Sequence, residues 1–364
     1  MEHAGKAYSE REISNVKEIK CGIIGSGVIA PVHLESYRKI PGVTVKTLCD
    51  IIPEKAAALA EKYKVSNVCT DYLDLLRDPE IDCVSICTDH ASHGQIAADA
   101  LDHGKHVICE KCLTATDAQL ETALSAHKRH PELVFAGVFQ HRYEPSNRLL
   151  RSMIENGKFG TLLTASLNVT CLRTDEYYNS DPWRGTWAHE GGSVLINQAV
   201  HHFDLLRFFL GNIDSLCASW SNRVHPKSIE TEDTINVLLN FKNGVHAIFC
   251  ATSGCKAETW HNAFTFTGTD GYLEYNQFKP VFGKFTDPET EKNLMQQFQN
   301  CMEAYKLEAG KNYYGSGHPA QLADFIGAVR EGRAPFVTGE EAGETARAVH
   351  ACYESGRTGK WVKL

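Results

Sequence analysis

The sequence predicts an α/β protein with two domains: an N-terminal doubly wound parallel sheet, and a C-terminal α+β domain with a large, open, mostly antiparallel sheet. Three observations support this prediction. Between residues 19 and 141, short apolar runs alternate with amphipathic stretches of helical length, which is typical of parallel strands joined by crossover helices. Further along the chain, apolar runs follow one another with turn residues between them. The length of 364 residues suits two domains better than one.

The N-terminal domain is expected over residues 19–141. We interpret the polar, aperiodic residues 1–18 before it as a mobile arm. Short runs that are apolar on both faces predict parallel strands, and the amphipathic stretches between them predict helices that cover the sheet. The expected strands are IKCGIIG, VTVKTLCD, DCVSICT, KHVICE and LVFAGVF, and the expected helices are HLESYRKI, PEKAAALAEKYK, SHGQIAADALDHG and TATDAQLETALSAHKRH.

The C-terminal domain is expected over residues 142–364. It starts with a helix near 144–157 and ends with helices near 318–331 and 339–356, while a helix at 192–210 interrupts the strands. The expected strands are TLLTASLNVTCL, SLCASWS, TINVLLNF, VHAIFCAT, NAFTFTG and GYLEY.

Two features of these strands predict how the second sheet is built. Asn243-Gly244 and Asp270-Gly271 are dipeptides typical of hairpin turns. Helices are expected on one face only, and we expect the bare face to be rich in alternating Val, Leu and Phe. Because such a face needs a cover, we expect a homo-oligomer, a dimer or a tetramer, that associates through this sheet.

Composition and charge exclude several classes of function. Hydrophobic residues make up 43% and charged residues 23%, which are ordinary values for a globular protein. The formal net charge of −8 offers no basic surface, so neither nucleic acid nor an anionic membrane is expected as a partner. No apolar run reaches the ~18 residues of a membrane span, and the first 20 residues hold no signal-peptide core. Most of the 13 cysteines lie in apolar runs, which favours buried thiols and a cytoplasmic location.

The first strand is followed by the pattern G-x-G-x-x-A. Gly25 permits a tight turn, Gly27 lets the backbone approach a pyrophosphate, and Ala30 allows close packing of the helix on the strand. The start of the next helix offers free N–H groups to the phosphates. We therefore expect a dinucleotide-binding Rossmann domain, with Val28 and Ile29 of the same turn also in contact with the cofactor.

The second strand ends with an acidic residue, Asp50, twenty residues after Ala30. Its carboxylate can accept hydrogen bonds from both hydroxyls of an adenine ribose, and it would repel a 2′-phosphate. No Arg or Lys follows directly, since the next residues are Ile51, Ile52 and Pro53. The sequence therefore favours NAD over NADP.

The rest of the chain carries four motifs in a fixed order. They are Cys87-Thr88 with His93, Glu110-Lys111-Cys112, Gly191-Gly192 followed by Asn197, His201 and Asp204, and the closing stretch from Gly317-His318 to the C-terminus. With these motifs, residues 19–364 resemble the glucose–fructose oxidoreductase/inositol dehydrogenase (Gfo/Idh/MocA) family.

This resemblance implies a role for each motif residue. Thr88 and His93 would line the nicotinamide-ribose side of the cofactor, and Glu110 would bond to that ribose. Lys111 would point at the reacting carbinol oxygen, and His201 would exchange its proton.

The residues themselves agree with a site around Lys111. This lysine follows an apolar strand at the carboxyl edge of the sheet, where doubly wound folds bind their ligands. Asn197 and His201 are four residues apart on one expected helix, so they share a face, and Asp204 could orient His201. The neighbouring His202 points away from that face, which favours a structural role for it.

Further contacts are expected around the cofactor and the substrate. We expect Gln140 to contact the cofactor and Arg142 to contact the substrate. Trp183-Arg184, preceded by two tyrosines, is typical of a sugar-binding loop, because aromatic faces stack on pyranose C–H faces. A surface loop held together by aromatic packing is the alternative interpretation of the same residues.

Two positions depart from the family pattern. Asn197 replaces the acid of the inositol dehydrogenases, so His201 lacks a charged partner there and should titrate near an ordinary histidine pKa. Cys112 replaces a proline and forms a C-x-x-C with Cys109, but Cys109 lies in a buried strand, which disfavours redox or zinc chemistry. The histidines are scattered, so no metal site is expected.

The predicted function is NAD-dependent transfer of a hydride to or from a secondary carbinol of a sugar or sugar derivative, for example C3 of a pyranoside. Lys111 would stabilise the alkoxide, and His201, assisted by Asn197, would take the proton. Two alternatives stay open. One is an NAD-dependent, redox-neutral glycoside hydrolase, and the other is a non-catalytic sensor of dinucleotide or sugar.

Overall fold

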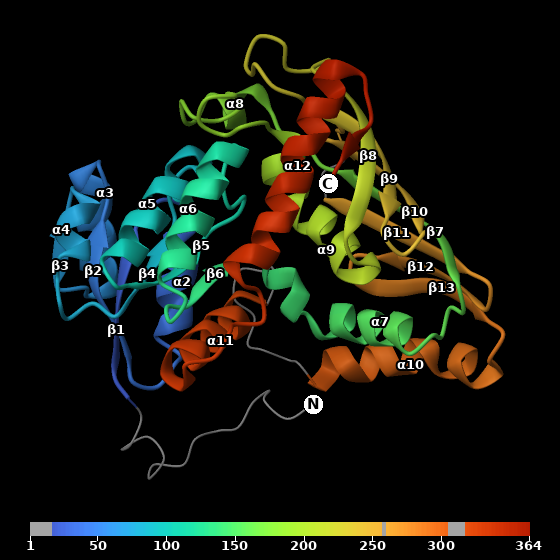
Figure 1. Ribbon diagram of the computed structural model, residues 1–364, viewed down its shortest axis with the longest axis horizontal. Helices are drawn as coiled ribbons and strands as arrows, with labels where there is room; N and C mark the ends of the chain where they lie inside the picture. Colours follow the sequence, from blue (N-terminus) through green and yellow to red (C-terminus); the bar gives the residue numbers. More distant parts are fainter. Residues whose placement is uncertain (1–16, 257–259, 305–316) are drawn as a thin grey trace.

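The computed structural model describes residues 17–256, 260–304 and 317–364. The arm expected over residues 1–18 therefore lies outside the described residues, apart from its last two. Two domains lie side by side, each built on one sheet, and the long helix α12 (Gly339–Thr358) runs between the sheets (Figure 1). Within the described ranges, no helix is both long and apolar enough to cross a membrane.

The N-terminal domain contains six parallel strands in the order β3-β2-β1-β4-β5-β6. This is the strand order of a Rossmann fold, which confirms the predicted fold class. The strands are β1 (Ile19–Ile24), β2 (Val43–Cys49), β3 (Asn67–Cys69), β4 (Cys83–Ile86), β5 (His106–Cys109) and β6 (Phe135–Gly137). The sequence analysis missed β3, because its short and largely exposed segment makes no apolar run.

Helices cover both faces of this sheet. They are α2 (Ala30–Tyr37), α3 (Pro53–Tyr63), α4 (Tyr72–Leu76), α5 (His90–Asp102), α6 (Asp117–Arg129) and, from the end of the chain, α11 (Gly317–Glu331). The register places Ile24 of β1 beside Ile86 of β4, and Ile86 beside Cys109 of β5. The segments that follow these three residues therefore meet at one edge of the sheet.

The C-terminal domain contains eight strands in the order β13-β12-β11-β7-β10-β9-β8-β14. Strands β7 and β10 pair in parallel and the other neighbours are antiparallel, so the predicted open, mostly antiparallel sheet is confirmed. The strands are β7 (Leu162–Thr170), β8 (Ile213–Ser221), β9 (Thr234–Phe241), β10 (His246–Thr252), β11 (His261–Gly268), β12 (Gly271–Asn276), β13 (Lys279–Phe285) and β14 (Val362–Lys363). Both predicted hairpin turns join antiparallel neighbours, and Gly244 has a φ of 88°.

The remaining helices are η1 (Gln140–Tyr143), α7 (Pro145–Glu155), α8 (Asp175–Tyr178), η2 (Val194–Ala199), α9 (Val200–Leu210) and α10 (Pro288–Ala304). Helix α10 and strand β13 were not expected, because their sequences carry few consecutive apolar residues. The expected helix at 192–210 is present, but its first part, η2, is π-helical. Asn197 and His201, expected on one continuous helix, therefore lie in two different helical segments, η2 and α9.

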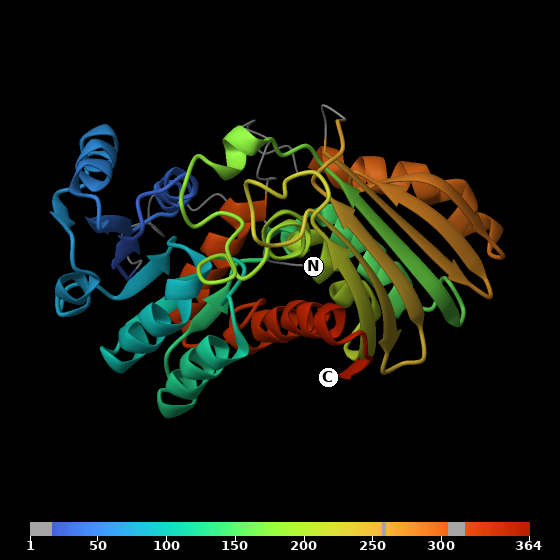
Figure 2. The same cartoon turned by 90° about the horizontal axis from the view of Figure 1, so that it is seen from above.

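The bare face of the large sheet differs from the prediction. The helices lie on one side of this sheet, and Figure 2 shows its outer side without helices. The large apolar residues of the strands, such as Val237, Phe249 and Phe264, are buried on the inner side. The outer side carries mostly Thr, Ser and Asn, with Leu238 and Ile248 about half exposed. The alternation of the strands therefore turns the bulky residues toward the helices rather than outward.

Candidate active site

The first strand-to-helix turn lies at the sheet edge between β1 and α2. Gly25 has a φ of 93°, and a Cβ there would lie 2.5 Å from the Cys87 carbonyl oxygen, so only glycine fits. A Cβ at Gly27 would meet no atom within 4 Å, so the backbone is open to an approaching group. The buried hydroxyl of Ser26 has no hydrogen-bond partner in the part of the chain that the structure describes. The turn therefore fits the pyrophosphate of a dinucleotide.

The acidic residue at the end of β2 faces the same turn. Asp50 accepts hydrogen bonds from the backbone N–H of Ser26 at 2.8 Å and from that of Ile52 at 2.9 Å. Each carboxylate oxygen has a second lone pair, which leaves Asp50 able to accept the two ribose hydroxyls. Val28 is 69% exposed at the turn, and Ile29 beside it is half-buried. Their contacts with the cofactor stay a prediction.

His93 has a different role from the predicted one. It is fully buried in α5, and its ring nitrogens lie 2.9 Å from the carbonyl oxygen of Cys112 and 3.1 Å from that of Thr88. Both nitrogens face the backbone, so His93 ties the ends of β4 and β5 together and does not line a ribose. Thr88 itself is half-buried, and its hydroxyl oxygen accepts a hydrogen bond from Ser92 at 2.7 Å.

Glu110 lies at the end of a buried polar chain beneath the sheet edge. Its Oε1 is 3.0 Å from Nε2 of His33, whose Nδ1 is 3.0 Å from the hydroxyl of Ser85. His318 of α11 approaches the same carboxylate oxygen at 3.7 Å. Burial raises the pKa of Glu110, but the two histidines outweigh this effect and hold the pKa well below its usual range. Glu110 is therefore an anion that supports the backbone of Lys111, to whose N–H its Oε2 lies at 3.1 Å.

Lys111 reaches across from the first domain to the second. Its Nζ donates hydrogen bonds to the backbone oxygen of Asn197 at 2.9 Å and to the side-chain Oδ1 of Asn197 at 2.8 Å. An ammonium group has three N–H bonds, so one remains for a substrate oxygen. Burial lowers the pKa of Lys111, and nearby carboxylates offset only part of this effect. The predicted pair of Lys111 and Asn197 is therefore brought into contact.

His201 lies beside this pair at the start of α9. Its Nε2 is 3.5 Å from Nε2 of Gln140, so the amide donates when that ring nitrogen carries no proton. Burial lowers the pKa of His201 well below its usual value, and His141 and Lys111 lower it further. The expectation of an ordinary pKa is thus corrected, because the sequence could not show how deeply this ring is buried. A neutral imidazole is the form that can accept a proton.

His202, the neighbour of His201 in the sequence, packs among aromatic rings. Its ring stacks on Phe278 at 5.9 Å and lies 5.6 Å from the ring of His141. Burial lowers the pKa of His202 to about 4. A neutral, stacked ring in this position indicates packing.

Glu190, which was not among the expected site residues, is buried directly behind Asn197. Its Oε1 accepts a hydrogen bond from Asn197 Nδ2, and its Oε2 accepts one from the backbone N–H of Gly185. The signal that could have indicated it is an acidic residue directly before Gly191-Gly192, where a tight turn buries its neighbours.

The loop around Trp183-Arg184 is held by its own packing. The guanidinium of Arg184 lies over the rings of Tyr177 at 4.4 Å and Trp183 at 4.8 Å, and it donates to the Tyr177 hydroxyl at 2.6 Å. The edge of Trp183 meets His90 of α5 at 5.9 Å. These contacts account for the aromatic residues, and they leave Trp183 half-buried between the two domains.

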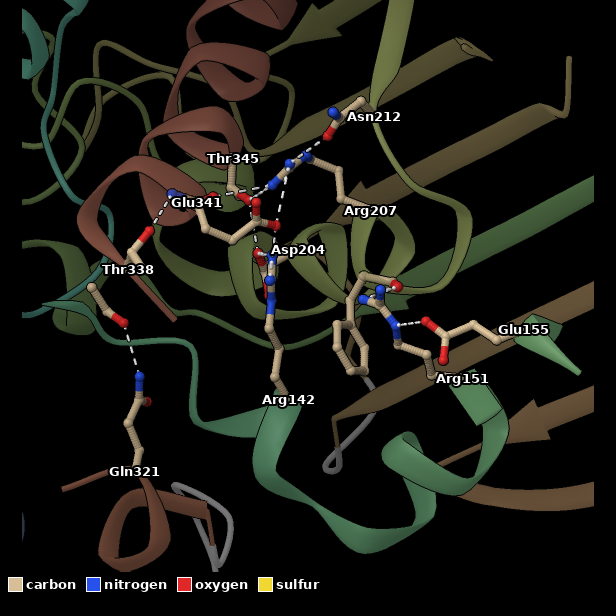
Figure 3. Close-up of polar contacts among 12 residues, drawn as sticks. Arg142, Arg151, Glu155, Asp204, Arg207, Asn212, Gln321, Thr338, Glu341 and Thr345 are labelled. Atoms are coloured by element: carbon tan, nitrogen blue, oxygen red, sulfur yellow. Dashed lines mark hydrogen bonds and ion pairs between the residues drawn. The ribbon is translucent and has the colours of Figure 1, made fainter. Parts of the chain in front are cut away.

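The prediction that Arg142 contacts the substrate is corrected. Its guanidinium donates two hydrogen bonds to Asp204, at 2.6 and 2.7 Å, and one to Glu341 at 2.9 Å (Figure 3). Asp204 also accepts a hydrogen bond from Thr345 at 2.7 Å, so its carboxylate does not orient His201. Arg142 and Asp204 are 2% and 1% exposed, which leaves them out of reach of a ligand. They form a structural network that joins η1, α9 and α12.

The two cysteines that flank Glu110 and Lys111 are buried thiols. Cys109 and Cys112 are fully buried, and burial raises the pKa of both thiols, to about 12 for Cys112. All 13 cysteines lie within the described ranges, and none is paired in a disulfide. Among the residues that the structure describes, no three His, Cys, Asp or Glu side chains are grouped as metal ligands.

Two family models match the chain. One is the NAD-binding Rossmann fold of the Gfo/Idh/MocA oxidoreductase family, over residues 19–138, and the other is the C-terminal alpha/beta domain of this family, over residues 151–364. The levoglucosan dehydrogenase of Pseudarthrobacter phenanthrenivorans is 24% identical, with 96% of this chain and 99% of that protein covered. The myo-inositol 2-dehydrogenase of Thermotoga maritima is 23% identical, with 95% and 98% covered.

A solved structure shares the fold over nearly the whole length. The WlbA dehydrogenase of Bordetella pertussis, determined in complex with NADH and UDP-GlcNAcA, superposes with a TM-score of 0.87 at 24% identity. The match covers 96% of this chain and 98% of that one. The two family models, which span both domains, show that the chain belongs to the Gfo/Idh/MocA oxidoreductase family and that its first domain is an NAD-binding Rossmann domain.

Proposed function

We propose that the protein is an NAD-dependent dehydrogenase that oxidises a secondary carbinol of a sugar or polyol, or reduces the corresponding ketone. The observation that carries this proposal is the contact of Lys111 with Asn197, which leaves one N–H of a half-buried ammonium group for a substrate oxygen. The names of the relatives, levoglucosan dehydrogenase and myo-inositol 2-dehydrogenase, support the substrate class.

The proposed roles follow from the contacts. Lys111 donates a hydrogen bond to the carbinol oxygen and stabilises the alkoxide as the proton leaves. His201 accepts that proton at Nε2, the nitrogen that faces Gln140. Asn197 holds Lys111 in place. Gly25, Gly27 and Asp50 would bind NAD, which supplies the hydride acceptor.

The carbon oxidised and the assembly are finer parts of the proposal. We propose C3 of a pyranoside as the first position to examine, with Trp183 packing on the sugar. We also propose a homo-oligomer through the outer face of the large sheet. Leu238 and Ile248 are directly paired there and half exposed, which makes a small apolar strip for contact with a second copy.

The proposal is tested with a panel of sugars, inositols and glycosides in the presence of NAD. The expected result is steady-state formation of NADH with at least one of them, and NMR of the product identifies the oxidised carbon. Release of an aglycone without accumulation of NADH would instead identify a redox-neutral hydrolase. Absence of turnover with every compound, in protein shown to bind NAD, would contradict the proposed function.

A further inference from the structure

Glu190 is a buried carboxylate that the proposed roles do not use. It is 1% exposed, and it lies in the loop before η2 rather than in a helix or strand. Both of its oxygens accept hydrogen bonds, one from the Asn197 side-chain amide and the other from the Gly185 backbone N–H. Its own backbone oxygen is 2.8 Å from Nδ1 of His90 in α5. Glu190 is therefore fixed from both domains.

A continuous chain of hydrogen bonds leads from this carboxylate to Lys111. The amide of Asn197 has two ends: Nδ2 donates to Glu190, and Oδ1 accepts from Lys111 Nζ at 2.8 Å. An amide can satisfy a carboxylate and an ammonium group at once only in this orientation. The orientation of the Asn197 amide is thus set by Glu190, which binds its Nδ2 end.

We propose that Glu190 is a positioning residue, whose ionised carboxylate holds the Asn197 amide with its oxygen toward Lys111. A protonated Glu190 would have an O–H to donate, but its two neighbours, Asn197 Nδ2 and Gly185 N–H, are both donors. The conflict is removed if the amide turns over, and Lys111 then faces an NH₂ group instead of an oxygen. This inference rests on the proposed role of Lys111 at the carbinol oxygen.

The surroundings of Glu190 place this change of charge in an accessible pH range. Burial raises the pKa of Glu190 to about 7, and hydrogen bonds and nearby cations offset part of that rise. The titratable or charged side chains around it are Lys111, Arg184, His90, Tyr177 and Tyr178. Because the ionised form is the one that positions Lys111, turnover should fall as the pH drops through 7.

The test is the pH profile of kcat in Glu190→Gln. We expect kcat at pH 8 to fall about 10- to 100-fold, the range for a misplaced catalytic group, while the KM for NAD stays unchanged. We also expect the ionisation near pH 7 to disappear. Glu190→Asp keeps the charge, so it should keep that ionisation. If Glu190→Gln keeps both the rate and the ionisation near pH 7, the proposal is overturned.

Glu232 provides a matched control. It is equally buried, and burial also raises its pKa to about 7. Its carboxylate accepts hydrogen bonds from the Leu195 backbone at 2.9 Å and from the Tyr353 hydroxyl at 2.8 Å, not from Asn197. We expect Glu232→Gln to keep the ionisation near pH 7. If the ionisation near pH 7 were lost in Glu232→Gln but kept in Glu190→Gln, it would belong to Glu232. That result would overturn the proposal.

Two further measurements keep the proposal testable if turnover or folding fails. If circular dichroism shows that Glu190→Gln is unfolded, Asn197→Ala replaces it, because this variant breaks the same chain of hydrogen bonds in the middle. Asn197→Ala must then also remove the ionisation near pH 7.

A second readout needs no substrate: it is the rate at which acetic anhydride acylates Lys111 at pH 8, followed by peptide mass spectrometry. Without the Glu190 charge the pKa of Lys111 falls, so acylation should speed up in Glu190→Gln and not in Glu232→Gln. Faster acylation in a protein that oxidises no sugar would contradict the proposed function alone, whereas unchanged acylation would contradict the role of Glu190.

Discussion

Two clusters of charged residues contact the segment that contains η2 and α9. They differ in how much hydrogen-bonding capacity their charged groups leave unused. In the first cluster, Lys111 is half-buried and donates two of its three N–H groups to Asn197. At the second, Arg142 is 2% exposed, and both oxygens of Asp204 accept its N–H groups (Figure 3). The first cluster can bind a substrate oxygen, whereas the second can only hold the chain together.

The difference shows that a buried charge alone does not identify a site. From the sequence, both Lys111 and Arg142 were expected to contact the substrate, and each cation follows a strand of the first domain. In the structure, a carboxylate on α9 meets Arg142 directly, and a buried pair of this kind is structural. An amide meets Lys111 and leaves the ammonium group partly unsatisfied. Unused hydrogen-bonding capacity at an accessible position is the feature that separates the two.

The largest effect is expected for Lys111→Ala. Turnover should fall by about 10²–10⁴, because the variant loses the group that stabilises the developing alkoxide. Folding should not suffer, since Lys111 is half-buried and anchors only Asn197. Steady-state NADH formation gives the rate, and quenching of tryptophan fluorescence by NAD shows that the variant still binds the cofactor. Normal turnover in correctly folded Lys111→Ala would place the catalytic group elsewhere.

The second cluster should respond in the opposite way. Asp204→Asn removes the fully buried one of the two carboxylates that pair with Arg142, which should cost about 3–5 kcal/mol of unfolding free energy. Urea denaturation followed by tryptophan fluorescence measures this loss, and the turnover of the folded fraction should change little. Glu341→Gln is the control: Glu341 is 41% exposed, so its loss should cost about 1 kcal/mol or less. A large fall in turnover for Asp204→Asn with unchanged stability would reverse the assignment.

The adjacent histidines give the third test. His201→Ala should lower oxidation by about 10²-fold through loss of the base, and His202→Ala should lower only stability. The base acts in its neutral form, so the rate falls as the pH drops through its pKa. Because burial holds the pKa of His201 well below the usual histidine value, its acid limb should lie at a lower pH than the ionisation of Glu190 near pH 7. If the acid limb of the pH–rate profile were lost in His202→Ala but kept in His201→Ala, His202 would be the base.

The parts that the sequence could predict depend on neighbours along the chain. The turn at Gly25 and the position of Lys111 follow from a strand and the residues directly after it, and the structure has both. Asn197, which contacts Glu190, lies in a π-helix that no periodicity indicated. The low pKa of His201 comes from burial first and then from His141, which belongs to a distant segment. Burial and long-range pairing decide these features, and a sequence pattern does not contain them.

The smallest effect is expected for a change at Asp50. This residue extends the comparison of the two cations to an anion with unused hydrogen-bonding capacity. Its carboxylate accepts two backbone N–H groups, from Ser26 and Ile52, and still has lone pairs for the hydroxyls of an adenine ribose. A 2′-phosphate would bring a second negative charge against it, so NAD should bind at least about tenfold tighter than NADP, or about 1.4 kcal/mol.

The variant Asp50→Asn tests this preference more cleanly than alanine. Alanine would leave Ser26 N–H and Ile52 N–H without an acceptor and would weaken both cofactors through the turn. Asparagine removes the charge and keeps one oxygen acceptor, so only one of the two backbone N–H groups loses its partner. The ratio of the NAD and NADP dissociation constants should therefore narrow while NAD still binds. Fluorescence titration of both proteins with NAD and NADP gives the ratio. Equal affinities in the unmodified protein would show that the Asp50 carboxylate, although it has lone pairs to offer, does not meet the ribose.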